Sequence, residues 1–285
     1  MRNPVTLVPL VLCAACAASP PEARWKAPGA VSVPLAGTWP PLVSAVVEGP
    51  GANAPARLMI DTGAEDAALD EKLAEFLELG RTWRLAQVQG FDKEQGGVGT
   101  RTVFKREVKA LSLEGVCRLE DLDVLPLPMP SSRDGAIGLA AFPGRAVILD
   151  PERQVLSFVP RPEVDALVRR EGACVLAARR DGNLLLVRAS LETRAGTFER
   201  DMIVDTGSSE SYLTEDALRE MHLPRPAGDE VVTGVKLGSL AAGKKVFGID
   251  RGGRFCTLGG AVLLELGRPI LFDLEGARVV LLPPG

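Results

Sequence analysis

The sequence predicts a mainly β protein built from two copies of one unit, each containing a short helix. When the chain is shifted by 144 residues, positions 29–79 align with positions 173–223 without a gap. Both halves consist of short Val, Leu and Ile runs separated by Gly and Pro, which is typical of β structure. They also end alike, because "GRAVILDPERQVLSFVP" (144–160) matches "GRPILFDLEGARVVLLP" (267–283), and each copy predicts a hairpin with Asp150 or Asp273 in its turn.

Residues 1–16 are expected to be an export signal. Arg2 precedes an apolar stretch that is too short for a comfortable membrane span. Its end, "LCAAC", is similar to the lipobox of bacterial lipoproteins, which implies an exported, periplasmic protein of the cell envelope that is anchored to the membrane by lipid on Cys16. Cys13 stands where Leu is more usual, so cleavage by an ordinary signal peptidase near Ala17 or Ser19 is the alternative. The Pro-containing residues 17–28 then form an extended tether.

Composition argues against nucleic acid as a partner. The chain of 285 residues is 46% hydrophobic and 25% charged, which suits a globular protein with two small cores. Its net charge is −4, it has no block of Lys or Arg, and only 5% of its residues are aromatic. Phosphate binding needs a clustered basic surface, and base stacking needs aromatic side chains.

The residue inventory also argues against metal, cofactor or histidine chemistry. His222 is the only histidine, and we expect it to be a solvated side chain of a surface helix. A Ser/His or Cys/His hydrolase would need it, and the sequence has no GxSxG, HExxH, Walker or GxGxxG motif. Cys117, Cys174 and Cys256 have apolar flanks and are expected to be buried, unreactive thiols, with one disulfide among them as the alternative. We therefore expect no metal and no cofactor.

The most informative repeat is an apolar strand that ends on an acidic residue. "ARLMIDTGAEDAAL" aligns with "RDMIVDTGSSESYL", so the Asp-Thr-Gly that begins at Asp61 falls opposite the one that begins at Asp205. A single copy predicts an ordinary turn. Two copies at equivalent positions are hard to assign to chance, and a carboxylate at the end of a buried strand is costly without a partner. We therefore expect the two carboxyl groups to meet near the axis between the halves.

A short helix is predicted after each of these loops. Asp70 and Thr214 can N-cap the two helices, with acidic residues in the first turn, where the helix dipole favours negative charge. The chain then divides into a first lobe over 29–160, a linker over 161–172 with room for one helical turn, and a second lobe over 173–285.

These motifs resemble those of the aspartic peptidases, the retropepsin- and pepsin-like family. "LMIDTGAED" is similar to the retroviral-type motif and "IVDTGSS" to the pepsin-type motif. "DGAIGLAAF" (134–142) is similar to the second hallmark of the family, in which Ala136, Ile137 and Gly138 would pack against the Asp loop. Its counterpart in the second half, Leu258-Gly259-Gly260, is out of step by one or two positions. The resemblance spans about residues 29–285 and implies two pseudo-symmetric acid-protease-like β-barrel lobes with an active cleft between them.

The resemblance implies an aspartic endopeptidase. Two adjacent carboxylates cannot both ionise cheaply, so Asp61 and Asp205 would share one proton and activate a water molecule for attack on a peptide bond. The supporting residues would be Thr62 and Thr206, which brace the two loops, and Gly63 and Gly207, which turn the chain tightly and present amides to the carboxylates. Because one chain supplies both halves, we expect a monomer that acts on a peptide or protein substrate.

A substrate flap is expected in the first lobe. Gly144 comes 83 positions after Asp61, but Gly267 comes only 62 positions after Asp205. The best candidate is "QVQGFDKEQGGVGTRTVF" (87–104), with an ordinary hairpin loop as the alternative. Its tip would be formed by Gly96, Gly97, Val98 and Gly99. The only tyrosine, Tyr212, lies in the second lobe, so the flap tyrosine of pepsin-type enzymes has no match.

A catalytically silent peptide-binding or envelope-assembly module with the same fold is the alternative function. The shorter second lobe and its irregular Gly motif favour this module. The retained pair of carboxylates favours the enzyme, because a binder has no reason to keep two costly charges. The balance favours the enzyme.

Overall fold

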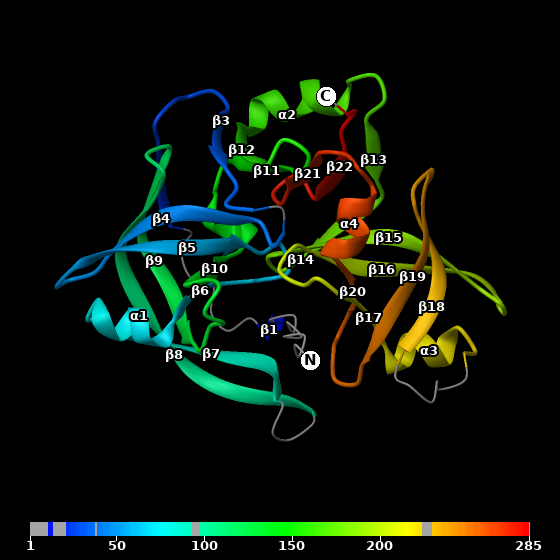
Figure 1. Cartoon of the computed structure of the whole chain (residues 1–285), viewed down its shortest axis with the longest axis horizontal. Coiled ribbons are helices and arrows are strands. Elements are labelled where there is room, and N and C mark those ends of the chain that lie inside the picture. The colour runs from blue at the N-terminus through cyan, green and yellow to red at the C-terminus, as the bar shows by residue number, and fades with distance from the viewer. Residues whose placement is uncertain (1–10, 14–20, 38, 93–96, 224–229, 285) are drawn as a thin grey trace.

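The computed structural model describes residues 11–13, 21–37, 39–92, 97–223 and 230–284. It is mainly β, with two barrel lobes side by side and a third sheet that lies against both of them (Figure 1). This confirms the fold class predicted from the repeat. Cys16 and Gly96, two of the predicted functional residues, lie outside the described residues.

The first lobe is a closed barrel. The strands of its sheet are β1 (Val11–Cys13), β2 (Glu22–Trp25), β4 (Leu42–Glu48), β5 (Asn53–Ile60), β6 (Ala67–Asp70), β7 (Arg81–Asp92), β8 (Gly97–Leu113), β9 (Cys117–Leu127) and β10 (Gly135–Ile137). In the described part of this sheet, β8-β4-β5-β10-β6-β9 forms a ring, because β8 pairs with both β4 and β9. β1, β7 and β2 extend the sheet beyond the ring.

The second lobe repeats this ring strand by strand. Its strands are β14 (Ala178–Asp181), β15 (Leu184–Thr193), β16 (Gly196–Asp205), β17 (Ser211–Thr214), β18 (Glu230–Leu237), β19 (Leu240–Asp250) and β20 (Cys256–Gly259). The order β15-β16-β20-β17-β19-β18 closes through the pairing of β15 with β18. The matching orders confirm the duplication. Among the described residues β7 has no equivalent in this lobe, so the extra length of the first lobe lies in the β7–β8 hairpin.

The third sheet is shared by both halves. Its strands are β3 (Val31–Pro34), β11 (Arg145–Asp150), β12 (Val155–Pro160), β13 (Cys174–Leu176), β21 (Ile270–Asp273) and β22 (Arg278–Leu281), in the order β13-β22-β21-β11-β12-β3. The two predicted hairpins are confirmed, and β11 pairs with β21, so that Ile148 faces Leu271. Asp150 and Asp273 form turns as expected, because each carboxylate accepts a backbone N–H three residues ahead.

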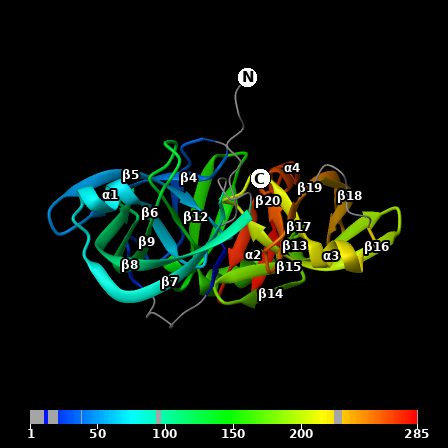
Figure 2. The same ribbon diagram turned by 90° about the horizontal axis from the view of Figure 1, so that it is seen from below.

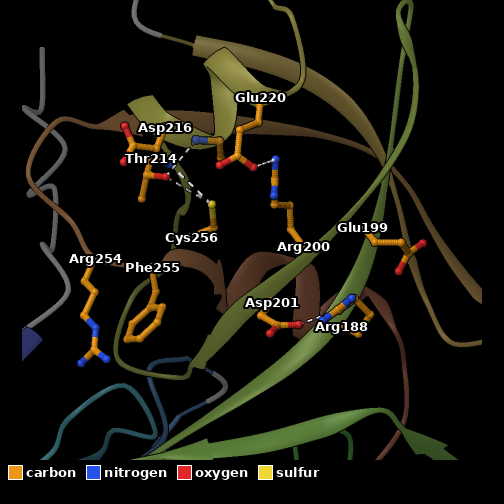
Figure 3. Close-up of a pocket in the computed structure, with 11 residues that line it drawn as sticks. Arg188, Glu199, Arg200, Asp201, Thr214, Asp216, Glu220, Arg254, Phe255 and Cys256 are labelled. Atoms are coloured by element: carbon orange, nitrogen blue, oxygen red, sulfur yellow. Dashed lines mark hydrogen bonds and ion pairs between the residues drawn. The ribbon is translucent and has the colours of Figure 1, made fainter.

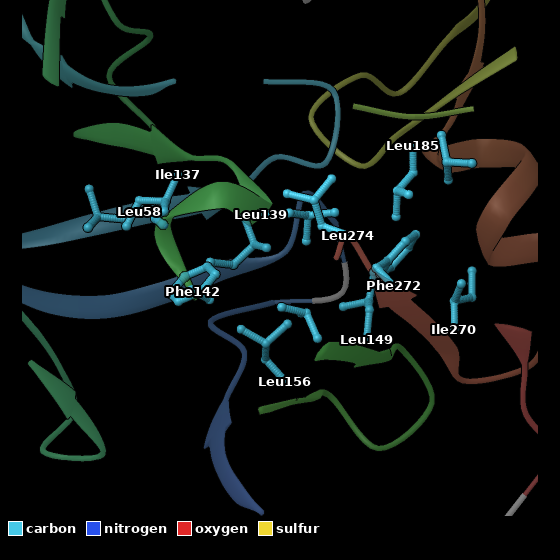
Figure 4. Packing of buried hydrophobic residues seen from close by; sticks show 14 of the residues in the cluster. Leu58, Ile137, Leu139, Phe142, Leu149, Leu156, Leu185, Ile270, Phe272 and Leu274 are labelled. Carbon is cyan, nitrogen blue, oxygen red and sulfur yellow. The ribbon is translucent and has the colours of Figure 1, made fainter. Parts of the chain in front are cut away.

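One hydrophobic core runs from the first barrel through the shared sheet into the second barrel. Leu58 and Phe142 of the first lobe, Leu149 and Phe272 of the shared sheet, and Leu185 of the second lobe all belong to it (Figure 4). The other face of the shared sheet is covered by α2 (Arg161–Val168). This helix has eight residues and is therefore longer than the single turn expected in the linker.

The remaining helices are short. They are α1 (Glu71–Phe76), α3 (Glu215–Glu220), α4 (Gly260–Glu265) and a 3-10 turn at Leu139–Ala141. Asp70 caps α1 by accepting the Lys72 and Leu73 amides, and Thr214 caps α3 by accepting the Ala217 amide, so both predicted caps are confirmed. Figure 2 shows α1 and α3 well apart from each other, α1 in the first lobe and α3 in the second. Of the helices in the described residues, none is both long enough and apolar enough to span a membrane.

Candidate active site

The structure brings Asp61 and Asp205 together where the two lobes meet. Asp61 directly follows β5 and Asp205 ends β16, and their exposed fractions are only 5% and 1%. The two carboxyl groups share a hydrogen bond. Each also lies against the opposite glycine: a Cβ on Gly63 would lie 2.5 Å from Asp205 Cγ, and one on Gly207 would lie 2.4 Å from Asp61 Cγ. Only glycine leaves room for this approach.

Thr62 and Thr206 hold the two loops together by reciprocal hydrogen bonds. The Thr62 amide donates to Thr206 Oγ1 at 3.0 Å, and the Thr206 amide donates to Thr62 Oγ1 at 3.1 Å. The Thr62 hydroxyl donates to the Val204 carbonyl, and the Thr206 hydroxyl donates to the Ile60 carbonyl at 2.7 Å. Every one of these bonds crosses between the lobes, so the geometry of the carboxyl pair depends on both copies of the repeat.

Backbone amides hold each carboxylate in place. The Gly63 amide donates to Asp61 Oδ1 at 2.9 Å, and the Gly207 amide donates to Asp205 Oδ1 at 2.8 Å. The Ser208 amide adds a second donor to Asp205 Oδ1 at 3.1 Å. Amide donors favour the ionised carboxylate and fix its orientation.

Burial shifts the pKa values of the two carboxyl groups in the direction opposite to that of the amide donors. It raises the pKa of Asp61, against the hydrogen bond from Asp205, the Gly63 amide and the charge of Arg133. It also raises the pKa of Asp205 well above its usual range, and the adjacent Asp61 carboxylate raises it further. The pair therefore titrates as a unit and keeps one proton at a pH at which isolated aspartates are fully ionised.

The second hallmark element takes the same place in both lobes. β10 runs parallel to β5 with Ile137 beside Ile60, and the Ile137 carbonyl accepts the Asp61 amide. β20 runs parallel to β16 with Leu258 beside Val204 and Gly259 beside Asp205. Leu258 and Gly259 are therefore the equivalents of Ile137 and Gly138. The irregular spacing seen in the sequence arises because the stretch between this element and the closing hairpin differs in length between the two lobes.

Arg133 is a charged residue near the pair that the sequence did not single out. Its exposed fraction is 8%, its Nη1 contacts Met59 Sδ at 2.7 Å, and Nε has no hydrogen-bond partner among the described residues. Burial lowers its pKa, while the charges of Asp61 and Asp205 raise it. Its position directly before the Asp134-Gly135 of the hallmark was the only available signal in the sequence.

Glu65 is a second such residue, and it contacts the other lobe. Its carbonyl accepts a hydrogen bond from Asn183 Nδ2 at 2.9 Å. Burial raises the pKa of the Glu65 carboxyl to about 7, and the neighbouring Asp66 and Asp181 carboxylates raise it further, against the Arg254 charge. Asp66 also binds Lys105 Nζ of β8 at 2.7 Å, which ties the β7–β8 hairpin to the Asp61 loop.

The other predicted residues lie as follows. The flap candidate is part of the β7–β8 hairpin, in which Asp92 pairs with Gly97, Phe91 with Val98, and Gly90 with Gly99. Tyr212 donates to Glu210 Oε2 at 2.7 Å in the second lobe. His222 follows the end of α3 and is exposed, away from the pair. Cys117 and Cys256 are buried free thiols with pKa values raised by burial, as expected, whereas Cys174 is partly exposed.

A separate hollow of about 410 Å³ lies on the second lobe, and neither Asp61 nor Asp205 lines it (Figure 3). Four of its charged side chains pair with each other: Arg200 binds Glu220, and Arg188 binds Asp201. The predicted site residues and this hollow are therefore distinct.

Comparisons with known proteins support the fold. No protein-family model matches the chain, and no curated protein sequence matches it either. Among solved structures, the aspartic proteinase from Irpex lacteus matches with a TM-score of 0.52 and 13% identity, over 90% of this chain and 98% of that one. Basic 7S globulin from soybean gives a TM-score of 0.47 and 11% identity, over 89% and 94% of the two chains. The chain thus has the two-barrel fold of an aspartic proteinase.

Proposed function

We propose that the protein is an aspartic-type endopeptidase with Asp61 and Asp205 as its catalytic residues. The observation that carries the proposal is the buried, hydrogen-bonded pair of carboxyl groups, held between the lobes by the reciprocal bonds of Thr62 and Thr206. A carboxyl pair of this kind is costly in a buried interface, and acid–base chemistry gives it a use.

The chemistry follows from the single shared proton. The ionised member of the pair accepts a proton from a water molecule, and the protonated member donates a hydrogen bond to the scissile carbonyl oxygen. Water attack yields a tetrahedral intermediate, which collapses when the leaving amine takes a proton from the pair. The amides of Gly63, Gly207 and Ser208 keep the carboxylates oriented through these steps.

The test is cleavage of a diverse peptide library by the complete chain, from acidic to neutral pH. Asp61→Asn and Asp205→Asn are each expected to lower cleavage at least about 100-fold, the scale of general acid–base catalysis. Asp216→Asn is the matched control, because Asp216 is exposed on α3 and should leave the rate unchanged. Circular dichroism checks folding. If the well-folded wild-type protein cleaves nothing at any pH, the enzyme proposal is wrong and the peptide-binding module takes its place.

We also propose that the chain is exported to the periplasm and anchored by lipid on Cys16. The support is the signal-like segment over residues 1–16 and its "LCAAC" ending. Cys16→Ser should prevent incorporation of radiolabelled palmitate and release the protein from the membrane fraction, whereas the control Cys13→Leu, which places the more usual residue at that position, should do neither. A labelled Cys16→Ser protein would contradict the assignment.

A further inference from the structure

One face of the β7–β8 hairpin exposes three large apolar side chains. The exposed fractions are 79% for Trp83, 44% for Leu85 and 46% for Phe104. Leu85 lies directly opposite Phe104 in the strand register, and exposed residues alternate along β7 from Trp83 to Leu85. A contiguous exposed apolar patch marks an interaction site more often than isolated apolar residues do.

The opposite face of the hairpin is already used by the fold. Ala86, Val88 and Val103 are buried there, in a small core with Ala68 and Leu125. The hairpin therefore cannot bury Trp83, Leu85 and Phe104 by turning over, since this would expose the buried set. These three side chains are free for a partner outside the chain.

Two arginines surround this patch. The Arg81 guanidinium lies 5.9 Å from the centre of the Phe104 ring, and the Arg84 guanidinium lies 5.7 Å from that of Trp83. Over residues 81–110 the sequence has seven Lys and Arg against three Asp and Glu, a net charge of +4 in a chain of net charge −4. Arg84 and Lys105 are paired with Asp123 and Asp66 outside this segment, which lowers the excess from +4 to +2. The hairpin is still a basic segment of an acidic protein, and it complements a negatively charged surface.

The N-terminal segment lies next to the same hairpin. β1 pairs with Gln87–Gln89 of β7. β2 lies antiparallel to β9 with Glu22 beside Glu120, and Asp123 of the same strand β9 binds Arg84. Only five residues separate Glu22 from Cys16, at most about 20 Å of extended chain. A lipid on Cys16 would therefore hold the membrane within this distance of Glu22, where β2 begins.

We propose that the surface formed by Trp83, Leu85, Phe104, Arg81 and Arg84 docks onto a bilayer that contains anionic phospholipids. The aromatic rings and Leu85 would enter the boundary between headgroups and acyl chains, and the Arg81 guanidinium would stay among the phosphates. Apolar contact and charge together give an attachment that neither gives alone. The proposal is independent of the peptidase chemistry.

The test measures Trp83 fluorescence in the complete chain mixed with vesicles. The Trp83 signal is obtained by subtracting the emission of Trp83→Phe, which keeps an aromatic ring. With vesicles of phosphatidylcholine and phosphatidylglycerol, the Trp83 emission should shift to the blue and be quenched by doxyl-labelled lipid. Both changes should weaken with pure phosphatidylcholine or with added salt, because the charge contribution is lost.

Variants separate the apolar and charged contributions. Leu85→Ser with Phe104→Ser should weaken the vesicle affinity seen by Trp83 at least about tenfold. Arg81→Gln should weaken it about fivefold on anionic vesicles only. Val232→Ser with Val246→Ser is the matched control, because these valines are a similarly exposed cross-strand pair on the second lobe and should have no effect.

Two results would overturn the proposal. The first is Trp83 emission that anionic vesicles leave unchanged, whatever the N-terminal segment does. The second is equal weakening by the hairpin double variant and by the control double variant. Trp83 emission that responds to an acidic peptide but not to vesicles would instead assign this face to a polypeptide partner.

Discussion

Replacing Thr206 with Val tests whether the reciprocal threonine bonds hold the two lobes together. The side chain is 1% exposed, and its hydroxyl donates to the Ile60 carbonyl at 2.7 Å and accepts the Thr62 amide at 3.0 Å. Val has nearly the same shape but cannot make either bond. Both backbone groups would then lie unpaired in a buried interface.

The magnitude follows from these two groups. An unpaired buried donor or acceptor costs about 1–3 kcal/mol, so Thr206→Val should lower the free energy of unfolding by about 2–6 kcal/mol. Thr206→Ser keeps the hydroxyl and removes one methyl group, which should cost only about 1 kcal/mol. The gap between the two variants isolates the hydrogen bonds from the packing.

Urea unfolding followed by circular dichroism measures both variants against the wild-type protein. Peptide cleavage should fall with Thr206→Val as well, because the same bonds fix the loop that carries Asp205. If Val and Ser unfold within about 0.5 kcal/mol of each other, the threonine bonds do not stabilise the lobe interface and the argument fails.

Three further predictions concern the site and its surroundings. Gly207→Ala should lower cleavage at least about tenfold, because the new Cβ would lie 2.4 Å from Asp61 Cγ; an unchanged rate would show that the loop can yield. Arg133→Met should move the pH profile of kcat/KM upward by up to about one unit, because the lost cation favoured the ionised pair, whereas Arg133→Lys should largely keep the profile. Glu65 has a pKa raised to about 7, so its stabilising contribution is complete below about pH 4 and is lost as the pH rises through 7. Urea unfolding should therefore find Glu65→Gln about 1–2 kcal/mol more stable than wild type at pH 8, a figure reduced for partial exposure, and no more stable at pH 4.

Most of the fold could be predicted from the sequence because the repeat consists of local patterns, in which the residues that interact lie close together in the chain. The caps at Asp70 and Thr214 and the two closing hairpins depend on residues three or four positions apart, and all of them appear in the structure. The shared sheet was not predicted. Each hairpin is complete as a local pattern, and nothing within it indicates that β11 pairs with β21 more than a hundred residues away.

The candidate site could also be predicted only in part. The pairing of Asp61 with Asp205 could be predicted because an axis of pseudo-symmetry brings equivalent residues together. Arg133 could not be predicted, because its burial depends on the segment before β10 folding back over β5, where Asp134 accepts the Arg57 amide. No local pattern marks an arginine that will lose its contact with water.

The strand registers also reveal a relation that the alignment of the sequence hides. Gly135 of β10 pairs with Leu58, and Cys256 of β20 pairs with Met202, which is the repeat equivalent of Leu58. Arg133 and Arg254 each lie two residues before them and therefore occupy equivalent positions in the two lobes. Yet Arg133 is 8% exposed and its charge acts on the carboxyl pair, whereas the Arg254 side chain is 65% exposed and binds Asp181.

This contrast shows where duplication constrains the protein. Thr62 and Thr206 bond to each other, and Gly63 and Gly207 each lie against the opposite aspartate, so a change in either copy disturbs both. Arg133 and Arg254 form no such reciprocal bonds in the described part of the chain, and each has a separate environment. Symmetry within the sequence is therefore a sound guide to residues at the axis. Residues next to the axis can differ between the two lobes. The buried charge of Arg133, which has no buried counterpart at Arg254, could therefore be found only from the folded chain.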